Sequence, residues 1–161
     1  MARTSSILYY VPMLRLTAAI IFASSLWAAD PWIGTWELDI AKSRISGPEV
    51  LKGVEATFAD KEGGWLILSD AQYRKDGQVL RRQISICLDG AEHPIPEKPG
   101  FIATSVRVDE VTVQQIEKNA GRVARIITYH LLPDGTLLRL VHVFKPDGAL
   151  ANDETQYFHR K

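Results

Sequence analysis

Short apolar segments alternate with closely spaced turn signals over most of this chain. From position 52 onward, stretches of about eight to eleven residues rich in Val, Ile, Leu, Thr and aromatics are separated by Gly-containing pairs. No stretch shows the helical spacing of apolar residues over a useful length. The turn signals are Gly63-Gly64, Asp76-Gly77, Asp89-Gly90, Asn119-Ala120-Gly121, Asp134-Gly135 and Asp147-Gly148. The pattern predicts an all-β protein whose strands are joined by hairpin turns.

The positions of these turns predict nine strands. Consecutive hairpins of matched length favour an up-and-down antiparallel arrangement, and closing it into a β-barrel removes the edges that a long open sheet would expose. The expected strands lie near 33–39, 52–60, 65–74, 78–88, 102–108, 111–118, 122–132, 136–144 and 149–159.

Turn chemistry also predicts which residues face one another. Pro133-Asp134-Gly135 suits a type I turn followed by a bulge glycine, which fixes the register of the flanking strands. The expected opposite pairs are Leu132 with Thr136, Tyr129 with Arg139, and Ile126 with His142.

The same turn type at Lys75-Asp76-Gly77 places Asp70 opposite Arg82. Their strands carry Leu66, Leu68, Leu80, Ile84 and Ile86 on the same face, which we expect to point inward. Inside the barrel the acid and the base have to pair, because a buried charge without compensation is costly. The alternative is a pair at the barrel rim, half in water.

The inward face of the later strands is less sharply defined. Odd positions from 111 to 143 are mostly apolar but include Gln115, Arg125 and Arg139, and even positions are interrupted by Thr and His. The apolar count favours the odd face inward by a small margin, and a register slip of one residue would reverse it.

Length and charge exclude several classes of function. The chain has 161 residues, 46% of them apolar, which fits one domain with a packed core. Its 19 basic and 19 acidic residues are spread without runs of like charge. Nucleic-acid binding is not expected, because neutralising phosphates requires clustered Lys and Arg.

Residues 1–29 differ from the rest of the sequence. Arg3 and Arg15 precede an apolar run from Leu16 to Trp27, which ends in Ala28-Ala29. This order is typical of a cleaved secretory signal peptide. We therefore expect a secreted or periplasmic, monomeric domain of residues 30–161 without a membrane span, and an uncleaved anchor is the alternative because no small residue stands three positions before the junction.

Candidate chemical groups are few. Cys87 is the only cysteine, so no intramolecular disulfide forms, and a buried apolar role is expected for it. His130 and His142 share a face but lie roughly 13 Å apart along the strand direction. His93, beside Pro94 and Pro96, is expected in a loop. We expect no metal and no cofactor. Standard catalytic signatures are also missing from the sequence, so we do not expect an enzyme.

The segment from Asp30 to Leu38, Asp-Pro-Trp-Ile-Gly-Thr-Trp-Glu-Leu, resembles the opening of lipocalins. Together with Ala41-Lys42-Ser43, Asp89-Gly90 and the later Asp-Gly turns, the chain resembles small exported bacterial proteins described as lipocalin-like, over nearly all of residues 30–161. Gly34-Thr35-Trp36 is also similar to the start of fatty-acid-binding proteins. Those proteins place two helices after the first strand, however, and residues 39–51 are too few for them.

The resemblance implies a barrel stoppered by Trp36 and able to hold one small, largely apolar molecule. Fatty-acid-binding barrels use Arg and Tyr of late strands to bind a carboxylate, so the resemblance implies ligand-binding roles for Arg125, Tyr129 and Arg139, which Arg82 joins from an earlier strand. The alternative is that the two later arginines point outward or pair with Glu117 and Asp153.

We therefore expect an exported protein that binds an apolar or amphipathic molecule, including one with an acidic head group. The alternative is an envelope interaction or structural module whose barrel is filled by its own side chains.

Overall fold

The computed structural model describes residues 30–161, and these form ten antiparallel strands. A short 3₁₀ helix, η1 (Pro48–Val50), lies between the first two strands. The strands are β1 (Gly34–Leu38), β2 (Leu51–Lys61), β3 (Trp65–Arg74), β4 (Val79–Cys87), β5 (Asp89–Pro94), β6 (Phe101–Asp109), β7 (Thr112–Asn119), β8 (Arg122–Leu131), β9 (Leu137–Phe144) and β10 (Leu150–Arg160). The prediction of an all-β protein is confirmed.

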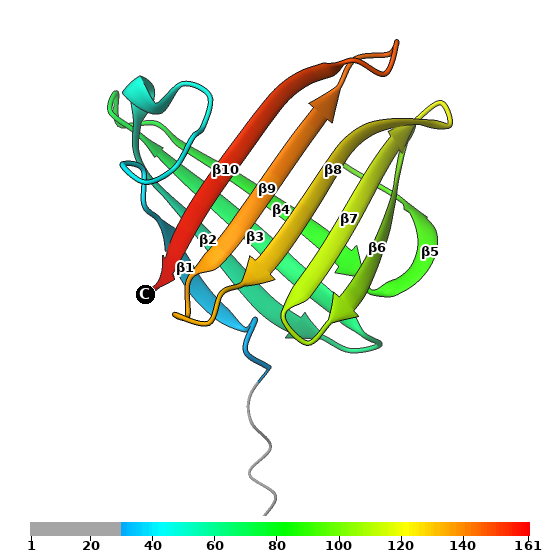
Figure 1. Ribbon diagram of the computed structural model, residues 1–161, viewed down its shortest axis with the longest axis horizontal. Coiled ribbons are helices and arrows are strands. Elements are labelled where there is room, and N and C mark those ends of the chain that lie inside the picture. Colours follow the sequence, from blue (N-terminus) through cyan, green and yellow to red (C-terminus); the bar gives the residue numbers. More distant parts are fainter. Residues whose placement is uncertain (1–29) are drawn as a thin grey trace, which may run out of the picture.

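The strands form one sheet that curls into a nearly closed up-and-down barrel. Their order is β4-β3-β2-β1-β10-β9-β8-β7-β6-β5, so the first and last strands pair and join the two halves of the sheet. In Figure 1, β6 to β10 form the front wall and β1 to β4 the wall behind it. The predicted architecture is confirmed.

The turns at Asp76-Gly77, Asp134-Gly135 and Asp147-Gly148 are built in the same way, and they fix the registers of their hairpins. In the turn of residues 132–136, the amide of Leu132 donates to the carbonyl of Thr136 at 2.8 Å, and the Asp134 carboxylate accepts from the Thr136 amide at 2.9 Å. Gly135 has a φ of 81°, in the left-handed region that glycine tolerates best. The predicted pairs of Tyr129 with Arg139, Ile126 with His142 and Asp70 with Arg82 are all confirmed.

The stretch after β4 differs from the prediction. Asp89-Gly90 is not a hairpin turn, because the chain passes from β4 into the short strand β5 and pairs with β6. Strand β5 was not predicted, because it holds a glycine, a bulge and a terminal proline instead of an apolar alternation. His93 therefore lies in a strand and not in the expected loop.

The barrel has one seam, between β4 and the β5–β6 hairpin. These elements are the two ends of the strand order and are not hydrogen-bonded to each other as neighbours. Side chains cover the seam instead, among them the buried Ile84, Ile86, Ile95 and Ala103.

The end of the barrel near residue 30 is filled by aromatic side chains. Trp36 is 1% exposed, and its indole nitrogen donates to the carbonyl of Trp32 at 3.2 Å. The Arg160 guanidinium lies 4.4 Å from the centre of the Trp36 ring and also donates to the Ile33 carbonyl. Phe58 contacts both Trp32 and Tyr129 edge to face, so rings from opposite walls meet inside. Trp36 thus plugs this end of the barrel.

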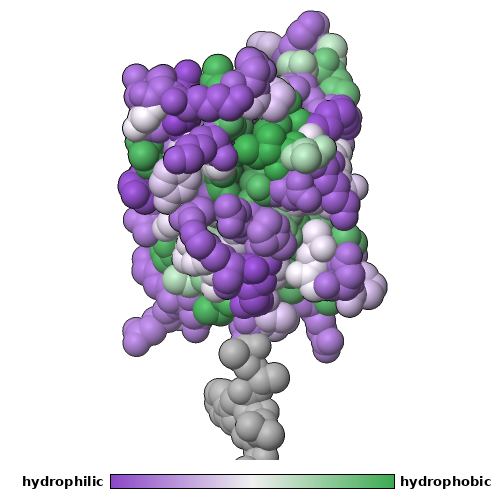
Figure 2. All heavy atoms as spheres, turned by 90° about the vertical axis from the view of Figure 1, so that its left-hand side faces the viewer, coloured by the Kyte–Doolittle hydropathy of each residue, from purple (hydrophilic) through white to green (hydrophobic). Residues whose placement is uncertain are grey.

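The odd positions of the later strands point inward, as their apolar count indicated. Buried side chains there include Val113, Ile127, Tyr129, Leu131 and Leu137. Leu80 is on the expected inward face but is 49% exposed, because it lies near the end opposite Trp36. Val50 and Val79 are exposed at that same end, and Figure 2 shows hydrophobic side chains gathered in the upper part of an otherwise hydrophilic face.

The expected signal segment, residues 1–29, lies outside the described part of the chain. Within residues 30–161 no helix has the length and apolar character needed to cross a bilayer.

Candidate functional site

A layer of charged side chains lies inside the barrel. Its first member is Asp70 on β3, which is 4% exposed. Arg139 on β9 reaches it from the opposite wall, with Nη1 3.1 Å from Oδ1 and 3.2 Å from Oδ2 of Asp70. This ion pair crosses the interior of the barrel.

Asp70 also forms an ion pair with Arg82, the residue opposite it on β4. Arg82 Nη2 donates to Asp70 Oδ2 at 2.8 Å, while 42% of the Arg82 side chain stays exposed. Burial alone would raise the pKa of Asp70, but the charges of Arg139 and Arg82 and their hydrogen bonds outweigh it and hold the pKa below its ordinary value. Asp70 is therefore an ionised carboxylate shared by two guanidiniums.

On its other side Arg139 contacts residues of β10. Its Nε donates to Gln156 at 2.5 Å, and Gln156 in turn donates to Glu154 at 2.6 Å. Burial tends to raise the pKa of Glu154, yet hydrogen bonds from Asn152, Ser46 and Gln156 bring it below its ordinary value. Glu154 thus supplies a second negative charge near Arg139, and this part of the layer is close to balanced.

Tyr129 on β8 is also buried inside the barrel. It pairs across the sheet with Arg139, and burial raises its pKa to about 12. The phenol is therefore neutral at physiological pH, and it is available to this layer as a hydrogen-bonding group and not as a charge.

A second acid, Glu117 on β7, lies closer to the seam side of the barrel and is 1% exposed. Lys98, in the turn between β5 and β6, donates to Glu117 Oε2 at 2.7 Å. Arg125 on β8 approaches Glu117 Oε1 at 3.7 Å, which is beyond hydrogen-bonding distance. One buried carboxylate thus faces two cations, and this cluster carries a formal surplus of one positive charge.

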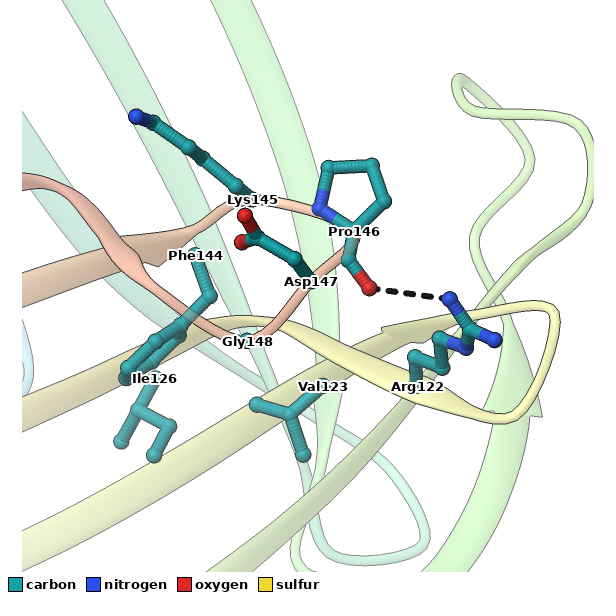
Figure 3. A pocket seen from close by; sticks show the side chains of 8 residues that line it. All are labelled: Arg122, Val123, Ile126, Phe144, Lys145, Pro146, Asp147 and Gly148. Atoms are coloured by element: carbon teal, nitrogen blue, oxygen red, sulfur yellow. Dashed lines mark hydrogen bonds between the residues drawn. The ribbon is translucent and has the colours of Figure 1, made fainter.

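Strands β8 and β9 separate from each other next to this second cluster. Hydrogen-bonded pairing between β8 and β9 ends at Arg125 and Val143, although β8 begins at Arg122. Beyond that point, Arg122 Nη1 donates to the carbonyl of Pro146 in the β9–β10 turn at 2.9 Å (Figure 3). We call this opening the β8–β9 gap.

Two hollows of about 690 and 450 Å³ meet at the β8–β9 gap and share several lining residues. Their apolar lining includes Phe101, Val123, Ala124, Ile126 and Phe144, and their charged lining is Arg122, Lys145 and Asp147. Figure 3 shows Ile126 and Phe144 side by side on the apolar wall, with Arg122 at the far edge.

The Glu117 cluster adjoins these hollows. Lys98 Nζ lies 5.6 Å from the centre of the Phe101 ring, which lines the smaller hollow. Phe101 thus contacts both this apolar hollow and a cation of the Glu117 cluster. Such an arrangement suits an amphipathic molecule with an anionic end.

The structure separates the four residues predicted to bind a ligand into two groups. Arg82, Tyr129 and Arg139 lie together around Asp70, and Arg125 lies with Glu117 and Lys98. Pairing of Arg125 with Glu117 was one of the expected alternatives and is confirmed, whereas Arg139 pairs with Asp70 and not with Asp153. Asp153 instead pairs with Arg44 and His142.

Two contacts of this layer were not predicted from the sequence: Arg139 with Asp70, and Lys98 with Glu117. Arg139 and Asp70 are 69 residues apart, and Lys98 is 19 residues from Glu117 in a stretch without strand pattern. The available signal was that Asp70 and Glu117 are acids at inward positions of their strands, and each therefore needs a cation.

No protein-family model matches the chain, and no curated protein matches it. Among solved structures it is similar to the fluorescent protein UnaG, with 14% identity, a TM-score of 0.55, and coverage of 81% of this chain and 97% of that one. A siderocalin, Ex-FABP, matches with 14% identity and a TM-score of 0.36, over 81% of this chain and 74% of that one. The similarity to UnaG shows that the calycin-like barrel fold is shared.

Proposed function

We propose that the protein binds a small amphipathic molecule with an acidic head group. The observation that carries this proposal is the pairing of two cations, Lys98 and Arg125, with the single buried carboxylate of Glu117 beside the β8–β9 gap. The ligand's anionic end pairs with Arg125, and its apolar part lies against Phe101, Ala124 and Phe144.

The dimensions of the gap support this proposal. The two hollows lie within the size range of sites for small ligands, roughly 300–1,000 Å³. Arg122 and Lys145 at the edge add positive charge, which attracts an anion before it enters, while Asp147 offsets part of it. The protein acts by holding this molecule and not by transforming it.

Displacement of a fluorescent probe tests the proposal. The full-length protein is saturated with anilinonaphthalene sulfonate and titrated separately with decanoate and decanol, which share a chain length but differ in the head group. Decanoate is expected to displace the probe at a concentration at least about tenfold lower, because a charge-assisted hydrogen bond contributes about 1.5–3 kcal/mol. Equal potency of the two compounds, or no displacement by either, contradicts the proposal.

The filled-barrel alternative is favoured by one specific observation. The Asp70–Arg139 pair and the ring contacts of Phe58 occupy the interior with the chain's own side chains. On this account no molecule enters, and partner proteins contact the outer surface of the strands. Mass spectrometry of the protein purified under non-denaturing conditions separates the two, since a filled barrel carries no bound small molecule.

Export is a further part of the proposal. It is supported by the apolar run from Leu16 to Trp27 and the Ala28-Ala29 that follows it. Amino-terminal sequencing of the protein recovered from the cell envelope fraction and from the medium tests it, with Asp30 as the expected first residue. A protein that stays with the cytoplasm and retains Met1 contradicts export.

A further inference from the structure

A small cavity lies at the seam of the barrel, away from the β8–β9 gap. Its volume is about 210 Å³, and it is bounded by β3 and β4 on one side and by β5 and β6 on the other. Trp65, Cys87 and His93 line it, and Ser105 and Gln115 also belong to its lining.

Gln115 is the unusual member of this lining. The residue is 1% exposed, and neither its Nε2 nor its Oε1 has a hydrogen-bond partner among residues 30–161. A buried amide without partners is rare in folded proteins, because losing its bonds to water costs free energy. The cavity next to Gln115 is thus suited to a polar occupant that supplies these partners.

Three metal-ligating side chains converge beside this cavity, and two of them, Cys87 and His93, line it. One ligand atom each from Cys87, Asp89 and His93 lies within 4.8 Å of the other two. His93 Nε2 is 2.9 Å from one oxygen of Asp89 and 3.0 Å from the other. In a tetrahedral zinc site, bonds of about 2.0–2.3 Å put neighbouring ligand atoms roughly 3.3–3.7 Å apart, so only small side-chain movements are needed.

The backbone brings these residues together where the chain leaves β4. Asp89 and His93 are four residues apart, which in a regular strand means roughly 13 Å. The bulge between Asp89 and Glu92 shortens this span, and Gly90 allows it with a φ of 75°. The Trp65 ring packs against the His93 imidazole with 5.0 Å between ring centres and holds its orientation.

The ligand chemistry selects a class of metal. A thiolate, an imidazole and a carboxylate together suit Zn²⁺ and related divalent transition metals, whereas Ca²⁺ and Mg²⁺ prefer oxygen ligands alone. Two negative charges and one neutral imidazole also balance a divalent cation. A site with three protein ligands leaves one coordination position for water or another small molecule.

We propose that Cys87, Asp89 and His93 bind a divalent transition metal of the Zn²⁺ class at the barrel seam, with the fourth position open to the cavity that Gln115 lines. The amide of Gln115 then hydrogen-bonds the molecule in that position. This site is independent of the amphipathic ligand at the β8–β9 gap.

Cobalt substitution tests this directly. Full-length protein with its thiol kept reduced is titrated with Co²⁺, and the absorption spectrum is recorded. Wild-type protein is expected to show the intense near-ultraviolet band of a cobalt–thiolate bond together with the visible bands of tetrahedral Co²⁺, and Zn²⁺ should abolish both at one equivalent. A spectrum of hexa-aqua Co²⁺ alone overturns the proposal.

Variants identify the ligands. Cys87→Ser is expected to abolish the thiolate band, and His93→Gln is expected to weaken Zn²⁺ binding about 100-fold or more, since even residues behind the ligands contribute about 10–100-fold. His142→Gln is the matched control, because His142 also contacts an aspartate, Asp153, but lies on β9, five strands along the sheet order from β4, which carries Cys87. Should Cys87→Ser fail to fold, His93→Gln still decides, because His93 is partly exposed. Equal Zn²⁺ affinity of His93→Gln and wild type overturns the assignment.

A separate measurement tests the role of Gln115 beside the open coordination position. Gln115→Leu is expected to leave the thiolate band in place and to change how the visible bands respond when azide is added as a fourth ligand. An identical azide response in Gln115→Leu and wild type contradicts the role of Gln115 beside the open position.

Discussion

Asp70 on β3 and Arg139 on β9 meet across the interior of the barrel, with Oδ1 and Nη1 3.1 Å apart. Both residues are buried, and Gln156 and Arg82 complete their hydrogen bonding. The pair ties opposite walls of the barrel together.

Removing one partner of this pair should destabilise the barrel strongly. Asp70→Asn leaves Arg139 charged and buried, which typically costs about 3–5 kcal/mol in the free energy of unfolding. Combining it with Arg139→Met should recover much of that loss, because no uncompensated charge remains. Urea unfolding measures both variants.

The control for this prediction is Asp153→Asn, which breaks the exposed pair with Arg44 and should cost less than about 1 kcal/mol. Similar losses in the free energy of unfolding for Asp70→Asn and Asp153→Asn would show that the cross-barrel pair stabilises the fold no more than an exposed pair does.

The lowered pKa of Asp70 predicts how stability depends on pH. Above the ordinary value of 3.8 the carboxylate is charged in both the folded and the unfolded state, so its contribution is fully present. As the pH falls from there through the lower pKa of the folded state, that contribution is lost. The stability difference between wild type and Asp70→Asn should therefore be constant from pH 7 to about 5 and shrink in stronger acid. A difference that grows on acidification would be inconsistent with this account.

Trp36 should be the most costly single residue to truncate at the plugged end. Trp36→Ala removes a buried indole and its contact with Arg160, at an expected cost of about 3–5 kcal/mol. Trp36→Phe keeps a ring under Arg160 but loses the hydrogen bond to the Trp32 carbonyl, so a smaller loss is expected. Denaturant midpoints, compared at unchanged slope, measure the loss of stability in both variants. Equal losses in Trp36→Ala and Trp36→Phe would show that the aromatic ring contributes nothing.

Filling the β8–β9 gap should block the proposed ligand without unfolding the barrel. Ala124→Trp places an indole in the hollow between Phe101 and Phe144, and decanoate should then displace the fluorescent probe poorly. Ala151→Trp is the control, since Ala151 is exposed on β10 and does not line the hollows. Equal binding by Ala124→Trp and Ala151→Trp, with circular dichroism unchanged in both, would place the ligand elsewhere.

The turns and registers were predictable because they depend on neighbouring residues. Asp134 and Gly135 determine their own hairpin, and that hairpin places Tyr129 opposite Arg139. The inward face of β8 and β9 followed from the apolar count, although Arg125 and Arg139 interrupt it.

The contacts that shape the candidate sites were not predictable in the same way. The Asp70–Arg139 pair spans the barrel and leaves no local pattern, because any inward base on the opposite wall would serve. The convergence of Cys87, Asp89 and His93 depends on a bulge in a strand without apolar alternation, so spacing alone suggested a loop.

The affinity of Arg125→Gln for decanoate and decanol tests the central claim most directly. The substitution removes the cation that approaches Glu117 at 3.7 Å and leaves the apolar hollow intact. Calorimetric titration should show decanoate binding weakened about tenfold or more relative to wild type, with decanol binding unchanged. If both affinities stay as in the wild type, or both fall equally, Arg125 does not recognise the acidic head group, and the proposed binding mode is wrong.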